Sequence, residues 1–178
     1  MKWTSERQLR RRCDAALRGI EIPAPWDLDG FLRSLGDRRG REIVLAEAPE
    51  LTNSVSAKWW KDRDRDFIFY APTQSVFYLE LNVFHEVGHM LCGHDHPSAG
   101  QPFAGGDMEA LTTAPDAART IFSRSSRFDS VEEREAEFIA YRLKLLIEQR
   151  QSPSADDDDP ATAHLRQTMR RTLGSSAD

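Results

Sequence analysis

Cysteine is scarce in this chain of 178 residues, which contains only Cys13 and Cys92. The two lie in separate predicted helices and cannot supply the disulfide framework that holds small secreted domains together. We therefore expect both thiols to be reduced, as they are in proteins that stay inside the cell.

Long apolar runs are also missing. No uncharged apolar stretch reaches the roughly 18 residues of a membrane-spanning helix, and charged side chains run through residues 1–12, where a secretory signal would have its positive start and apolar centre. These absences predict a cytoplasmic protein with no membrane association.

Positive charge has no overall excess, since the formal net charge is −5 and the isoelectric point is near 5.6. Arginines are concentrated between Arg7 and Arg18, and an acidic block covers 156–159. An acidic chain with one basic helix favours a solvated helix face over a nucleic-acid site, so we expect no direct binding to nucleic acid.

The length fits one domain, which we expect over residues 1–150. Residues 151–178 are predicted to be a flexible acidic linker followed by a short C-terminal helix, because the first ten are rich in Ser, Pro and Asp.

Hydrophobic periodicity predicts an α+β fold. Helices are expected over 5–19, from a cap at Asp27 to a stop at Gly36, over 76–92 and over 130–149, and strands over 41–48, 54–60 and 66–71. We expect the strands to form a small antiparallel sheet packed on the apolar helix 76–92, with helix 130–149 closing the site.

That apolar helix contains His85-Glu86-Val87-Gly88-His89, an H-E-x-x-H pattern. Histidines four residues apart on a helix project to the same side and can reach one zinc ion at about 2.0–2.1 Å. Glu86 lies about 100° round the helix, where it can act on a metal-bound water as the general base. The motif predicts a zincin-like site with Zn²⁺ held by His85 and His89.

A catalytic zinc needs a third protein ligand, and two regions offer one. His94 and His96 follow the motif, but neither has the spacing of the metzincin extension, and we expect both in a solvent-facing loop. The other region is the start of helix 130–149, where Glu133 flanks the apolar face.

We predict Glu133 as the third ligand, with Glu132 and Glu137 as alternatives. Glu135 is expected to point away from the site, on a helix turned by about 100° per residue. Small Ala136 and its neighbours on the apolar face should allow this helix to approach the histidine helix closely.

Residues 85–94, HEVGHMLCGH, followed by 133–140, EREAEFIA, resemble the ImmA/IrrE metallopeptidase family, especially its short actinobacterial members. The resemblance covers about residues 5–150 and implies that Glu133 is the third zinc ligand. Glu137 stands where the family motif has Asn, which alters the surroundings of the metal.

The resemblance implies a zinc-dependent endopeptidase whose substrate is a specific protein, such as a helix-turn-helix transcriptional repressor. The alternative is a zinc-stabilised regulatory or toxin–antitoxin-type binding protein with little proteolytic activity. An intact Glu86 favours the enzyme.

Overall fold

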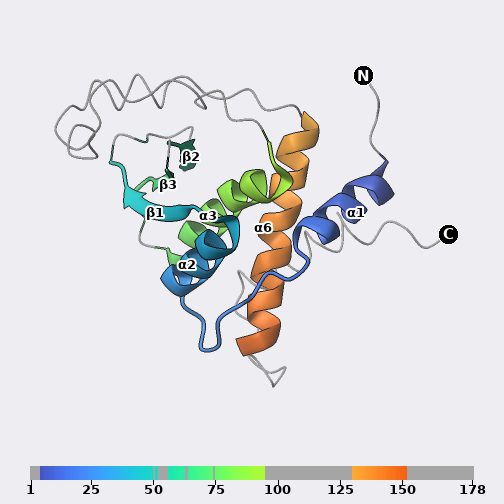
Figure 1. The fold of residues 1–178 in the computed structure, drawn as a ribbon, viewed down its shortest axis with the longest axis horizontal. Helices are drawn as coiled ribbons and strands as arrows, with labels where there is room; N and C mark the ends of the chain where they lie inside the picture. Colours follow the sequence, from blue (N-terminus) through green and yellow to red (C-terminus); the bar gives the residue numbers. More distant parts are fainter. Residues whose placement is uncertain are drawn as a thin grey trace.

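The structure, a computed structural model, describes residues 5–49, 51, 56–62, 64–73, 75–94 and 130–151. In chain order the elements are α1 (Glu6–Ala16), α2 (Leu28–Arg39), β1 (Glu42–Glu47), β2 (Ala57–Lys61), β3 (Arg65–Tyr70), α3 (Val76–Cys92) and α6 (Ser130–Gln151). Figure 1 shows α6 crossing beside α3, with the strands on the other side of α3. The predicted α+β class is confirmed, whereas the predicted linker and C-terminal helix lie outside the described residues.

The predicted antiparallel sheet is wrong, because the sheet is mixed. Its strand order is β1-β3-β2, with β2 antiparallel and β1 parallel to β3. The central strand contains Phe67, Ile68 and Phe69, which are all buried. A strand with consecutive apolar residues is suited to a position covered on both faces, so β3 separates β1 from β2.

Local signals place most helix ends where the sequence predicts them. Ser5 caps α1, Asp27 caps α2 through a 2.8 Å bond from the Gly30 N–H, and Ser75 caps α3. The predicted stop at Gly36 is wrong, since α2 continues to Arg39 and ends at Gly40 in the left-handed conformation.

Gly36 instead serves packing. A Cβ there would lie 2.8 Å from the Arg41 carbonyl oxygen, so only glycine lets α2 lie this close to the start of β1.

The main core lies between the sheet and the helices. It joins the buried Trp59 and Ile68 of the sheet to Phe84 and Val87 of α3 and to the apolar residues of α6. A second, smaller cluster on the opposite face of the sheet contains Trp60, Phe67 and Phe69, with Ala48 and Leu51. Helix α3 is thus buried between the sheet and α6, which makes it a rigid support for its histidines.

The close crossing of α3 and α6 depends on Gly88. A Cβ on Gly88 would lie 2.7 Å from the Cα and 2.8 Å from the carbonyl oxygen of Ala136. The predicted close approach at Ala136 is therefore confirmed, and its partner is the second variable residue of the H-E-x-x-H motif. Among the helices that the structure describes, none combines the length and apolar character that a membrane crossing requires.

Candidate metal centre

Three predicted ligands meet where α3 crosses α6. The Nε2 atoms of His85 and His89 are 3.1 Å apart. Glu133 of α6 places one carboxylate oxygen 3.3 Å from His85 Nε2 and the other 3.7 Å from His89 Nε2. These three side chains form a group that could hold a metal ion.

The separations within the group are those of ligands around a single metal ion. Ligands about 2.0–2.1 Å from a tetrahedral zinc are separated from one another by about 3.3 Å, close to the three observed separations. The pKa of His85 is lowered, mainly by burial, although the charge of Glu133 partly offsets this effect. A neutral imidazole keeps the lone pair that binds a cation, so two histidines and one carboxylate form a suitable donor set.

One side of the group faces solvent. The side chain of His89 is only 1% exposed, but those of His85 and Glu133 are 32% and 45% exposed. A metal held here would be accessible from the His85 and Glu133 side, as a catalytic site requires and a closed structural site does not.

Glu86 lies beneath this group and contacts the sheet. Its Oε2 accepts a 2.8 Å hydrogen bond from the backbone N–H of Trp59 in β2. Burial raises the pKa of Glu86 to about 8, the Trp59 N–H lowers it, the nearby charge of Glu133 raises it and Lys58 lowers it. Glu86 is therefore a buried carboxyl group whose charged form is disfavoured by burial.

The Trp59 N–H belongs to the outer edge of the sheet. The N–H of Asp62 donates to the Arg65 carbonyl and that of Ala71 donates to the Ser56 carbonyl, which fixes the hydrogen-bonded pairs of this hairpin. Because these pairs alternate along antiparallel strands, the backbone polar groups of Trp59 point away from β3. Of the predicted strands, 54–60 is thus β2, at the edge of the sheet in the part described, while 66–71 corresponds to the central β3.

The alternative ligands are placed differently from Glu133. Glu132 and Glu137 belong to neither group of potential metal ligands among the described residues. Glu137 is exposed, and its charge raises the pKa of His85. The structure therefore brings Glu133, and not these two, to both histidines.

Two predictions about nearby polar residues are wrong. Glu135 does not point to solvent but is fully buried, and His94 is not solvent-facing but only 5% exposed. The two are hydrogen-bonded at 3.0 Å. Helix α6 contacts both α3 and α1. It therefore buries residues on a wider part of its surface than a single apolar stripe. His96 lies outside the described residues.

A sulfur pair that the sequence did not reveal lies beside His94. The Cys13 thiol donates to the Glu135 carbonyl oxygen at 3.8 Å, and its interaction with Cys92 is the main cause that lowers the pKa of Cys92 to about 6 and raises that of Cys13. Burial lowers the pKa of His94, but bonds to Cys92 and Glu135 outweigh it and raise the value overall. Cys92, His94 and Glu135 form a second group with metal-ligand spacing.

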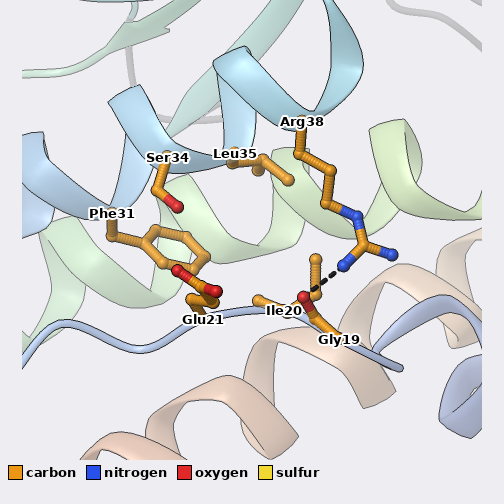
Figure 2. Close-up of a pocket in the computed structure, with 7 residues that line it drawn as sticks. All are labelled: Gly19, Ile20, Glu21, Phe31, Ser34, Leu35 and Arg38. Atoms are coloured by element: carbon orange, nitrogen blue, oxygen red, sulfur yellow. Dashed lines mark hydrogen bonds between the residues drawn. The ribbon is translucent and has the colours of Figure 1, made fainter.

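A separate pocket lies away from the histidines, between α2 and the segment that follows α1 (Figure 2). It has a volume of about 420 Å³ and is bordered by Phe31, Ser34 and Arg38 of α2 and by Gly19–Glu21. The Arg38 guanidinium donates to the Gly19 carbonyl oxygen across one end. None of the predicted site residues lines it, so the chemistry is assigned to the histidine group.

Comparisons with known proteins do not identify the chain: no family model, no curated protein and no solved structure matches it.

Proposed function

We propose that the protein is a zinc-dependent endopeptidase of the ImmA/IrrE type. Zinc is held by His85, His89 and Glu133, and Glu86 is the general base. The observation that carries the proposal is the meeting of three donor groups within 3.1–3.7 Å of one another, on an accessible side of the molecule.

The donor set and its base have complementary roles. Zinc, when bound, supplies a positive charge that polarises a scissile carbonyl and lowers the pKa of water toward about 7. Glu86 takes the proton of the attacking water and returns it to the leaving amine. The Trp59 N–H holds one oxygen of Glu86, which leaves the other oxygen for the proton.

The substrate class follows from the edge strand and from the sequence resemblance. A peptide in extended conformation can add to a sheet edge through its backbone, and β2 is an edge strand among the described strands, with its Trp59 N–H already bonded to Glu86. The resemblance to ImmA/IrrE proteins favours a helix-turn-helix repressor as the protein that is cut.

One observation favours a second candidate function, a zinc-stabilised regulatory protein. The bond between Glu86 and Trp59 ties β2 to α3, so Glu86 has a structural use even in a protein that cuts nothing. In that case the chain would bind its partner without proteolysis.

Glu86→Gln separates the two candidates. Gln keeps the acceptor oxygen for the Trp59 N–H but cannot take a proton at neutral pH. Zinc-loaded wild type is incubated with candidate helix-turn-helix repressors from the same organism, and fragments are identified by mass spectrometry with and without a chelator. We expect chelator-sensitive fragments from the wild type, and a rate about 10²–10⁴-fold lower from the variant.

Equal cutting by the variant would refute the role of Glu86. Binding of the repressor by both proteins without any cutting would favour the regulatory function.

A further inference from the structure

A chain of buried polar groups runs from His89 away from the candidate metal centre. His89 Nδ1 lies 2.8 Å from His94 Nδ1, and His94 Nε2 lies 3.0 Å from Glu135 Oε2. All three side chains are at most 3% exposed. We call His89, His94 and Glu135 the buried relay.

Arg12 of α1 contacts the far end of the buried relay. Its guanidinium lies 3.0 Å from Glu135 Oε1, close enough for an ion pair although not aligned as a hydrogen bond. A positive charge at this position complements an ionised Glu135, which then acts only as an acceptor.

The number of ring protons determines which nitrogen donates in each hydrogen bond of the buried relay. A carboxylate accepts, so His94 must carry its proton on Nε2. In its neutral form His94 has an unprotonated Nδ1, which can only accept from His89 Nδ1–H. His89 is thereby left with a bare Nε2, and this is the atom that faces His85 and Glu133.

The same count speaks against a second metal bound by Cys92, His94 and Glu135. If both His89 and His94 used Nε2 to bind metals, only one of their two facing Nδ1 atoms could carry a proton. One ring would then have lost its proton altogether, which a neutral imidazole at ordinary pH does not do. The buried relay is therefore the better use of His94 and Glu135.

We propose that His94 and Glu135 are positioning residues that hold His89 in the tautomer and ring orientation required for metal binding through Nε2. The proposal rests on the proposed metal centre, because it gives His89 the role of a ligand. Hydrogen bonds to the second nitrogen of a ligating histidine fix its tautomer, and losing them typically weakens metal binding about 10–100-fold.

The first test uses metal-free, full-length protein and does not depend on metal binding. With ¹⁵N-labelled histidine, long-range ¹H–¹⁵N spectra, recorded over a pH series that extends to the range where His94 is neutral, report which ring nitrogens carry protons. We expect His89 protonated on Nδ1 and bare on Nε2, and His94 protonated on Nε2 and bare on Nδ1. Protonation of His89 on Nε2, or of neutral His94 on Nδ1, would overturn the proposal.

The second test measures zinc affinity by competition with a chromophoric chelator. Glu135→Ala and His94→Ala should each bind zinc about 10–100-fold more weakly than the wild type. Asp14→Ala, which removes an exposed carboxylate from α1, is the control and should bind as the wild type does. Thermal melting of each metal-free variant verifies that it is folded.

Glu135→Gln distinguishes positioning from a purely structural role. Gln keeps an acceptor oxygen for His94 Nε2–H but loses the charge that faces Arg12, so we expect the wild-type tautomers and most of the zinc affinity. If Glu135→Gln loses as much affinity as Glu135→Ala, the ion pair carries the effect and the positioning role is wrong.

Different results would overturn the metal centre and the positioning role. A wild type that retains no zinc overturns the proposed metal centre. A wild type that retains one zinc, together with unchanged affinity in both alanine variants, overturns the positioning role alone.

Discussion

Substituting Gly88 with alanine should weaken the metal centre without touching a ligand. The added Cβ would lie 2.7 Å from the Cα of Ala136, whereas an ordinary carbon contact is about 3.5–4.0 Å. The two helices must therefore move apart by roughly 0.8 Å or more. Glu133 lies one turn before Ala136 on the same helix and should move with it.

That displacement is large for a metal site, where distances are held to about 0.2 Å. We expect Gly88→Ala to weaken zinc binding by at least about 10-fold. Losing a residue that orients a metal ligand has an effect of this size. The added methyl group should also destabilise the metal-free protein by about 1–3 kcal/mol through overpacking. Chelator competition measures the first effect, and thermal or urea unfolding measures the second.

Gly40→Ala is the matched control. Gly40 has φ 66° and no atom within 4 Å of an added Cβ, so alanine there introduces backbone strain of about 1 kcal/mol without a clash. It should lower stability and leave the zinc affinity unchanged. Wild-type affinity in Gly88→Ala would refute the argument that the α3–α6 crossing sets the distance between Glu133 and the histidines.

Three further predictions follow from the site. Glu133→Ala should lower zinc affinity far more than Glu137→Ala in chelator competition, since only Glu133 lies within 3.7 Å of both histidines; equal losses would reject the ligand choice. Burial raises the pKa of Glu86 from 4.5 to about 8, so its contribution to the stability of the metal-free protein is present below pH 4.5 and is lost as the pH rises through 8. The stability of Glu86→Gln should not fall in this way, so the variant should be more stable than the wild type at pH 9 by a few kcal/mol. A wild type that is less stable at pH 5 than at pH 9 would contradict this prediction. Interaction with the Cys13 thiol lowers the pKa of Cys92 to about 6, so alkylation of Cys92 in metal-free protein should rise with pH through about 6. Cys13→Ala should move that midpoint upward, and identical profiles would count against an interaction between the two thiols.

The sequence predicted those parts of the site that depend on a single helix. Histidines four residues apart must share a face, and the long apolar segment around them had to be a buried helix. Glu133 was also predicted, because its position beside the apolar face of α6 places it against α3.

The features that were missed depend on contacts between distant segments. Glu135 looked exposed because the apolar residues of α6 suggested one buried stripe, whereas Arg12 of α1 pairs with it from another side. His94 follows a helix-ending glycine and looked like a loop residue, but the chain turns back there to place its ring against His89. Similarly, strand patterns give no indication that β3, rather than β2, lies beside β1.

Metal stoichiometry tests whether His85, His89 and Glu133 form one zinc site. Full-length protein loaded with zinc and dialysed against metal-free buffer is analysed by mass spectrometry of its metal content. We expect one zinc per wild-type chain and none in His89→Ala, because two remaining ligands cannot retain the ion. A wild type without zinc, or a full equivalent of zinc in His89→Ala, would contradict it.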